Sequence, residues 1–277
     1  MEKVLIVGLG EVGSALYNIF RDSGKFKVYG YDIDKTRTVD ELDSIEKPVD
    51  YLHIALPYGR EFISIVKHYV SIFKPRIVFI HSTIAIGTTR AVYESTRITT
   101  AYTPVRGKHP NLTKHMLFWN KWVSALPIER IDECSNHLSN AGFKVKVCNT
   151  PPESLELAKL WETVYRAIMI ASWQELHRIA MKFKADIETV MEFVGEVHEI
   201  LRDRPIYFPG YIGGHCLIPN TKILLNQYPS KLFEFVLESN EKRLEELKDE
   251  EIKIEVDHLK NIGIKYVNTE YYGGKMD

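Results

Sequence analysis

A glycine-rich turn between an apolar run and a helical pattern is the feature that most constrains this chain. The turn has the spacing Gly8-x-Gly10-x-x-Gly13 and directly follows the apolar run Val4–Val7. In this context the first glycine makes a tight turn, the second lets the backbone approach a pyrophosphate, and the third lets a helix pack closely on the strand. Free N–H groups at the start of that helix, predicted over Ser14–Phe20, then face the phosphates. The pattern predicts a dinucleotide-binding βαβ unit.

An acidic residue stands where such a unit needs one. Asp32 ends the second predicted strand, about 20 residues beyond the glycines, where a carboxylate binds both ribose hydroxyls and repels the 2′-phosphate of NADP. NAD is therefore the favoured cofactor. A strand, a glycine turn and an acid also bind the ribose of S-adenosylmethionine, which stays an alternative. The predicted cofactor-binding residues are Gly8, Gly10, Glu11, Val12, Gly13, Asp32, Pro57 and Ser82.

Short apolar runs alternate with amphipathic stretches through the first half of the chain, as in βαβ units on a parallel sheet. Several runs are continuously apolar, which is typical of strands buried on both faces. The fold class is therefore α/β: a Rossmann-type, doubly wound parallel sheet, followed by a mainly helical domain with one long helix. The predicted strands are Val4–Val7, Lys27–Tyr31, Tyr51–Ala55, Ile77–Ile80, Thr99–Thr103, Trp122–Ala125 and Lys144–Val147, and a further helix is predicted over Arg60–Phe73.

The pattern changes at Thr150, where Thr-Pro-Pro-Glu predicts a helix start with Thr150 as the N-cap. Apolar residues then recur at helical spacing through Phe183 without Gly or Pro, which predicts one helix of about 30 residues, well above the usual length. Further helices are predicted over Asp186–Leu201 and from Lys231. The charged run Glu241–Lys253 predicts a solvated helix face.

Two domains follow from this change: a Rossmann-type cofactor domain over 1–150 and a helical dimerisation and substrate domain over 151–277. Lys plus Arg number 36 and Asp plus Glu 37, a balance that argues against a nucleic-acid partner. The 3 cysteines include no CxxC pair, so neither a disulfide framework nor a metal site is expected. Because no apolar run is long enough to span a bilayer and no leader pattern precedes the first strand, we expect a soluble cytoplasmic protein with no membrane contact.

Two further segments carry chemistry. The first, Ser82–Arg90, places Ser and Thr at the carboxyl end of the fourth predicted strand, where doubly wound sheets bind ligands. The alternative is a turn that caps a helix, and both roles can coexist. The second, Gly213-Gly-His-Cys-Leu-Ile-Pro219, sets glycines beside Cys216 and so allows a close approach to a nucleophile. Cys134 and Cys148 are interpreted as inert residues.

Taken together, these segments resemble the UDP-glucose/GDP-mannose dehydrogenases, which oxidise a sugar's primary alcohol to a carboxylate with NAD. The resemblance runs from residue 1 to about 245, over the family's NAD domain and central helical domain. It implies a homodimer through the long helix. The segments that carry it are Gly8–Gly13, Ser82–Arg90, Ala158-Lys-Leu-Trp-Glu-Thr-Val-Tyr-Arg166 and Gly210-Tyr-Ile-Gly-Gly-His-Cys-Leu-Ile-Pro219.

The resemblance assigns roles to individual residues. Cys216 matches the cysteine that captures the aldehyde intermediate, Lys159 the lysine that stabilises oxyanion charge, and Thr83 a threonine that holds a catalytic water. These three are the predicted catalytic residues. The predicted substrate-binding residues are Thr103, Arg106, Thr163, His215 and Asn220.

Three positions depart from the family pattern. Thr163 replaces an expected asparagine, Asn220 an expected aspartate, and Val105 an expected glutamate. Valine and asparagine cannot accept a proton, and loss of one positioned base costs about 10²–10⁴ in rate. The sequence also stops where the family continues into a third domain that grips the nucleotide, so a different mode of substrate binding is expected. Arg106, Lys108 and His109 form either a compact anion-binding cluster or an exposed basic loop.

The leading hypothesis is an enzyme, an NAD-dependent oxidoreductase acting on an alcohol of a sugar-like or anionic small molecule. The chief alternative is a scaffold reassigned to chemistry without hydride transfer, such as a methyltransferase that uses S-adenosylmethionine, or a ligand-binding protein. A third reading is a two-domain dehydrogenase of the β-hydroxyacid group, which also joins a Rossmann domain to a long helix and a catalytic lysine. The Gly-Gly-His-Cys loop argues against that reading.

Overall fold

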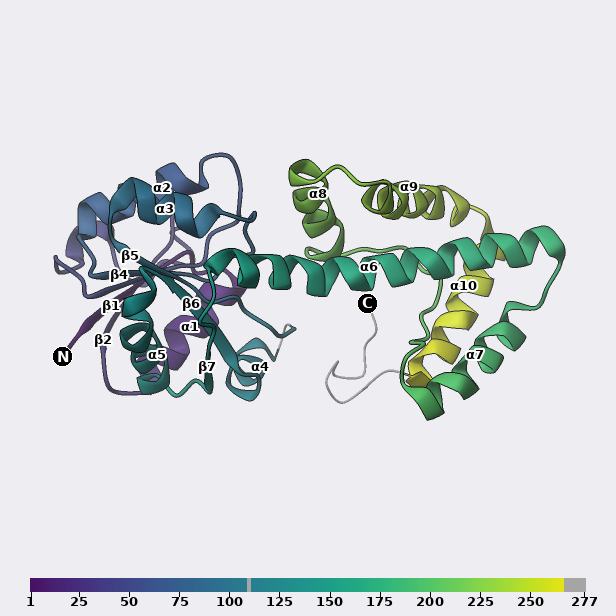
Figure 1. Cartoon of the computed structure of the whole chain (residues 1–277), viewed down its shortest axis with the longest axis horizontal. Coiled ribbons are helices and arrows are strands. Elements are labelled where there is room, and N and C mark those ends of the chain that lie inside the picture. The colour runs from purple at the N-terminus through teal and green to yellow at the C-terminus, as the bar shows by residue number, and fades with distance from the viewer. Residues whose placement is uncertain (109–110, 267–277) are drawn as a thin grey trace. The chain divides into compact units, whose positions relative to one another are not determined.

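The computed structural model describes residues 1–108 and 111–266 (Figure 1). The chain divides into two compact units, Met1–Lys159 and Leu160–Asp277. The division falls inside α6 (Pro152–Phe183) and not at its start. Within the described part of the chain, no helix is both long enough and apolar enough to cross a membrane.

The first unit is built on a seven-stranded sheet with the order β2-β1-β3-β4-β5-β6-β7. All the predicted strands form, with small shifts at their ends, and the α/β fold class is confirmed. Two strands depart from the prediction of a parallel sheet, because β6 pairs antiparallel with β5 and β7 pairs parallel with β6. The strands are β1 (Lys3–Val7), β2 (Lys27–Tyr31), β3 (Tyr51–Ile54), β4 (Ile77–Ile80), β5 (Thr99–Tyr102), β6 (Lys121–Leu126) and β7 (Val145–Val147).

Helices cover both faces of this sheet, as Figure 1 shows. They are α1 (Glu11–Asp22), α2 (Phe62–Phe73), α3 (Thr88–Thr96), α4 (Leu112–Phe118) and α5 (Ile131–Asn140), with short 3-10 turns at Leu42–Ser44 and Ile128–Arg130. Alternate strand residues point to opposite faces, so Ile6 packs in the core beneath α1, α4 and α5, and Leu5 in the core beneath α2 and α3. Both strand faces are buried, which explains the continuously apolar strand sequences.

The second unit is helical. Its elements are most of α6, then α7 (Ile187–Leu201), α8 (Leu217–Gln227), α9 (Lys231–Glu246), α10 (Glu250–Gly263) and a 3-10 turn at Ile264–Tyr266. Trp173 of α6, Met191 of α7 and Leu259 of α10 share one core cluster. Ala167 and Ala171 of α6 share a second cluster with Val236 of α9.

Of two local predictions about this region, one is wrong and the other holds only in part. Helix α6 begins at Pro152, so Thr150 does not cap it, and the Thr150 Oγ1 instead lies 3.0 Å from the Cys148 sulfur. The charged run Glu241–Lys253 is not only a solvated face, because Arg243 is fully buried. The single-chain pattern could not reveal that burial, since the partners of Arg243 come from α6.

Candidate active site

The glycine loop has the geometry that a dinucleotide needs. Gly8 adopts φ +89°, and a Cβ there would lie 2.7 Å from the Ala55 carbonyl oxygen. A Cβ on Gly13 would lie only 1.6 Å from the Gly8 carbonyl oxygen. At Gly10 the nearest atom to such a Cβ is the Arg37 Nη1 at 3.9 Å, so this side of the loop is open. Helix α1 starts directly after Gly10, which has no side chain to cap it.

Asp32 is fixed against this loop by its own carboxylate. The Leu9 backbone N–H donates to Asp32 Oδ2 at 2.6 Å, and the Asp34 N–H donates to Oδ1 at 2.8 Å. Each oxygen keeps a lone pair for a further donor, since an ionised carboxylate accepts about four hydrogen bonds. Asp34 forms an ion pair with Arg37 at 3.2 Å, which places that guanidinium near the loop as well. The carboxylate and the loop thus lie together, and they offer acceptors that could hold ribose hydroxyls and N–H groups that could hold phosphates.

Ser82 and Pro57 lie on the same edge of the sheet. The Ser82 hydroxyl donates to the Leu56 carbonyl oxygen at 2.5 Å, which ties the end of β4 to the turn that follows β3. Thr83 is half-buried beside it, and Pro57 is exposed. The structure therefore brings the predicted cofactor residues together with Ser82 and Thr83 at the carboxyl ends of the parallel strands.

Glu156 is a residue that the sequence reasoning missed. Its buried carboxylate accepts hydrogen bonds from the Gly87 N–H at 2.6 Å and from the Thr89 N–H and hydroxyl at 2.8 and 2.6 Å. Burial raises the pKa of Glu156, although these hydrogen bonds oppose the shift. Arg90 adds an ion pair to Glu153 at 2.5 Å. Gly87, Thr89 and Arg90 at the end of the Ser82–Arg90 segment thus anchor the start of α6. A glutamate on the apolar side of the helical pattern was the only sequence signal for this.

A chain of buried basic groups runs beneath the site. His81 Nε2 lies 2.8 Å from His53 Nδ1, and His53 Nε2 lies 2.9 Å from His137 Nε2. Lys121 Nζ contacts His81 Nδ1 at 3.2 Å and donates to the Thr103 and Pro104 carbonyl oxygens at 2.8 and 3.1 Å. No spacing in the sequence pointed to this chain, because its members come from β3, β6, α5 and the residue that follows β4.

Burial lowers the pKa of every member of this histidine–lysine chain. The pKa values of His53 and His81 lie well below the ordinary value, and that of His137 falls to about 3. Burial likewise lowers the pKa of Lys121, and the charges of Lys159 and Arg106 lower it further. The three imidazoles are consequently neutral near pH 7, and each contact between them carries a single proton.

The predicted substrate residues of the first unit, Thr103 and Arg106, differ in their burial and in their hydrogen bonds. The Thr103 hydroxyl is buried and has no hydrogen-bond partner within the described residues. Arg106 donates to the Asn120 carbonyl oxygen at 2.9 Å, and its guanidinium lies 4.9 Å from the centre of the Trp119 ring. Val105 is buried in the core below α1 and offers no base. Lys108 is half-buried, and His109 lies outside the described residues, so the predicted anion cluster stays a prediction.

In the second unit, two of the departures from the family pattern contact each other. Asn220 Nδ2 donates to Thr163 Oγ1 at 2.8 Å, and the Thr163 hydroxyl donates to the Leu160 carbonyl oxygen at 2.9 Å. Asn220 is buried. A neutral amide and a hydroxyl therefore satisfy each other where the family pattern expects an ionisable group.

Cys216 is the exposed cysteine of the three. It occupies the N-cap position of α8, and His215 beside it is also exposed. Cys134 is buried, and burial raises the pKa of its thiol to about 12, in agreement with an inert residue. Cys148 is half-buried. Across residues 1–108 and 111–266, no group of three or more His, Cys, Asp or Glu side chains is placed to hold a metal ion.

Comparison with known families bears on this geometry. Residues 153–242 match the model of the UDP-glucose/GDP-mannose dehydrogenase family, central domain. The resemblance seen in the sequence is confirmed. The matched range includes Lys159, Thr163, Cys216 and Asn220. Among curated protein sequences, none matches the chain.

Solved structures share the fold over most of the chain. The UDP-D-ManNAc dehydrogenase of Pyrococcus horikoshii matches with a TM-score of 0.75 and 19% identity, over 87% of this chain and 68% of that one. The UDP-N-acetyl-mannosamine dehydrogenase of Staphylococcus aureus gives 0.71 and 20%, over 87% and 68%.

A smaller neighbour matches over nearly its whole length. The 3-hydroxyisobutyrate dehydrogenase of Mycobacterium tuberculosis gives a TM-score of 0.63 and 14% identity, over 90% of this chain and 94% of that one. The family match and these neighbours all concern dehydrogenases, in agreement with the expectation of an enzyme.

Proposed function

We propose that this chain is an NAD-dependent oxidoreductase that acts on an alcohol of a sugar-like or anionic small molecule. The observation that carries the proposal is the glycine loop held to Asp32, because it leaves α1 uncapped and sets a carboxylate where ribose hydroxyls bind. The family-model match over 153–242 supports the oxidoreductase class.

The chain's own residues fit the cofactor. Gly8 and Gly13 leave no room for side chains, Gly10 opens toward solvent, and the amides of Glu11 and Val12 begin α1. NAD, when bound there, supplies the hydride acceptor. A preference for NAD over NADP follows from Asp32, since a carboxylate repels a 2′-phosphate.

Lys159 and Cys216 are the residues proposed to handle the substrate. An ammonium group stabilises the negative charge that develops on an alcohol oxygen as its proton leaves, which is the role proposed for Lys159. Cys216 supplies a nucleophile for an aldehyde product, and Thr83 a hydroxyl for a bound water. Thr103 and Arg106 offer a buried hydroxyl and a cation on the substrate side.

A second candidate function is oxidation of a hydroxyacid. The match to the 3-hydroxyisobutyrate dehydrogenase favours it, because that match covers 90% of this chain and 94% of the other. The Gly213–Cys216 loop favours the first candidate. The two differ in substrate, so a panel of hydroxyacids and nucleotide sugars separates them.

We further propose a homodimer formed through α6 and a cytoplasmic location. Leu157, Trp161 and Tyr165 recur at helical spacing on α6, with exposed fractions of 44%, 43% and 50%. Light scattering of the wild-type chain and of Trp161→Glu tests the dimer, which the charged variant should weaken.

A thermal-shift and calorimetric screen tests the cofactor. NAD should raise the melting temperature by mass action, NADP much less, and S-adenosylmethionine not at all. Tighter binding of S-adenosylmethionine than of NAD would overturn the proposal in favour of the methyltransferase reading.

A further inference from the structure

The segment that leads into Cys216 is held by two buried amide side chains. Asn240 of α9 exchanges two hydrogen bonds with Ile212: its Oδ1 accepts from the Ile212 N–H at 2.7 Å, and its Nδ2 donates to the Ile212 carbonyl oxygen at 3.1 Å. Gln174 of α6 donates from Nε2 to the Gly210 carbonyl oxygen at 2.7 Å. These contacts replace the backbone partners that a strand would have, so they fix the direction of the chain as it approaches Cys216.

The segment is also held on the other side of Cys216. The Asn220 N–H donates to the Cys216 carbonyl oxygen at 3.0 Å in the first turn of α8, and the Asn220 side chain donates to Thr163 of α6. Between these anchors, Gly213 to Cys216 are exposed, and Gly214 adopts φ +77° with no atom within 4 Å of a Cβ position. A short exposed loop therefore runs between two fixed ends.

The two amide side chains are themselves held in one orientation. The Ser239 hydroxyl donates to Gln174 Oε1 at 2.8 Å, which leaves Gln174 Nε2 to face Gly210. Arg178 donates to the Ser239 hydroxyl at 2.9 Å and to its carbonyl oxygen at 2.8 Å. Asn240 cannot rotate by half a turn, because its Oδ1 must face the Ile212 N–H. Interlocking buried hydrogen bonds of this kind favour one arrangement of the two amide side chains.

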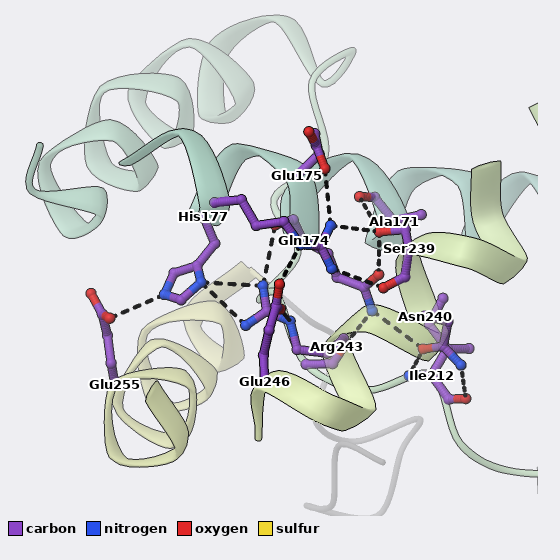
Figure 2. Close-up of polar contacts among 12 residues, drawn as sticks. Ala171, Gln174, Glu175, His177, Ile212, Ser239, Asn240, Arg243, Glu246 and Glu255 are labelled. Atoms are coloured by element: carbon purple, nitrogen blue, oxygen red, sulfur yellow. Dashed lines mark hydrogen bonds and ion pairs between the residues drawn. The ribbon is translucent and has the colours of Figure 1, made fainter. Parts of the chain in front are cut away.

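A buried arginine completes this network (Figure 2). Arg243 donates to the Gln174 carbonyl oxygen at 3.2 Å and to His177 Nδ1 at 3.2 Å. Because arginine only donates, His177 carries its proton on Nε2, which faces Glu255 at 3.1 Å. These contacts connect α6, α9 and α10. Arg243 is buried because α6 supplies hydrogen-bond acceptors for its guanidinium.

We propose that Gln174 and Asn240 are positioning residues that hold Cys216 at the N-terminus of α8. The proposal rests on the proposed function in one respect, that Cys216 is the thiol that meets the substrate. Neither amide touches Cys216, and both act through the backbone of Gly210 and Ile212. When these hydrogen bonds are lost, Cys216 no longer has a fixed position at the N-cap of α8, where the positive end of the helix favours an attacking anion.

The test measures the alkylation of Cys216 by iodoacetamide in the folded protein, with Cys148 of the first unit as the reference in the same sample. Asn240→Leu and Gln174→Met keep the shape of each side chain and remove its hydrogen bonds. Both should slow the labelling of Cys216 several-fold relative to Cys148. Ser230→Ala is the matched control: it removes the N-cap of α9, whose hydroxyl accepts from the Leu232 N–H, and leaves the grip on Ile212 intact.

A kinetic readout accompanies the labelling. Misplacement of a reacting group by about 1 Å costs up to about 10² in rate, so kcat should fall about tenfold or more while the dissociation constant for NAD is unchanged. Unchanged labelling in both variants, or equal slowing by Ser230→Ala, overturns the proposal. If Asn240→Leu fails to fold, Gln174→Met carries the test alone. A wild-type protein that labels rapidly at Cys216 but reduces no NAD refutes the proposed function and leaves the positioning role to be judged by labelling.

Discussion

The backbone N–H of Leu9 donates a hydrogen bond of 2.6 Å to the carboxylate of Asp32, which joins the glycine loop to the end of β2. The contact spans 23 positions in the sequence and sets the acid beside the mouth of the loop. The Asp32 side chain thereby shapes the loop and, under the proposed function, also selects the cofactor.

The first prediction concerns that choice. Asp32→Ala should weaken NAD binding and reduce the difference in affinity between NAD and NADP. The substitution removes both the acceptor for the ribose hydroxyls and the charge that repels a 2′-phosphate. Arg37, which lies near Gly10, then becomes the cation that a 2′-phosphate meets. Titration calorimetry of both cofactors measures the gap. If the variant prefers NAD over NADP as strongly as the wild-type protein does, another group selects the cofactor.

The second prediction tests the glycine packing. Gly13→Ala places a methyl group 1.6 Å from the Gly8 carbonyl oxygen, so α1 must move away from the sheet. Overpacking of this kind costs about 1–3 kcal/mol or more, and NAD binding should be lost with it. Gly59→Ala is the control, since nothing lies within 4 Å of its Cβ position. Urea unfolding and thermal shift with NAD compare the two variants.

The third prediction ranks the cysteines. Cys216 is exposed, Cys148 half-buried and Cys134 buried with its pKa raised to about 12, so iodoacetamide should label them in that order. Peptide mapping over time gives the three rates. If Cys216 proves the slowest of the three, it returns to a structural role, and Cys216→Ser should then leave activity intact.

The fourth prediction follows from the buried histidine–lysine chain. Burial lowers the pKa of His53, His81 and His137 in the folded state, so the unfolded chain takes up protons below pH 6.5 that the folded chain does not. Their contribution to stability is complete above pH 6.5 and is lost as the pH falls toward the folded values. Each such group contributes at most about 1.4 kcal/mol per pH unit to the slope of the free energy of unfolding against pH.

Lys121 affects stability in the same direction, but at higher pH. The free energy of unfolding declines as the pH falls from 10.5 toward the lowered pKa of Lys121 in the folded state. Urea unfolding at a series of pH values measures the slope. His137→Phe should reduce the slope of the free energy of unfolding against pH, below pH 6.5, by about the contribution of one titrating group. His68→Gln, at an exposed histidine, is the matched control and should leave the slope unchanged.

The fifth prediction concerns stoichiometry. We expect one NADH per substrate molecule, because the positions where the family pattern expects carboxylates hold a core valine, Val105, and a buried amide, Asn220, paired to Thr163. A second oxidation and a hydrolysis each need a base. Absorbance with mass spectrometry of the product tests this. Two NADH per turnover with a uronic acid product would show that another residue, with Glu162 the first candidate, supplies the base.

Much of the architecture was predictable from local pattern. Apolar runs bounded by turns marked the strands, and the absence of Gly and Pro marked α6, which spans 32 residues. The glycine loop and Asp32 were identifiable because their roles depend on short spacings. The Gly-Gly-His-Cys segment and its resemblance to the dehydrogenase family were identifiable for the same reason. The antiparallel pairing of β6 was not, because strand direction depends on how the connection after β5 folds back, and not on strand composition.

Neighbours along the chain are therefore enough to specify the helices and strands, the cofactor motif and the cysteine loop. Which distant polar groups meet in the interior depends on the folded chain. Glu156 accepts hydrogen bonds from the Ser82–Arg90 segment, the three histidines contact one another and Lys121, and Asn240 forms hydrogen bonds with Ile212. In each case the partners are far apart in the sequence. A polar side chain carries no local signal of burial, because burial is tolerated only where the fold brings it a partner.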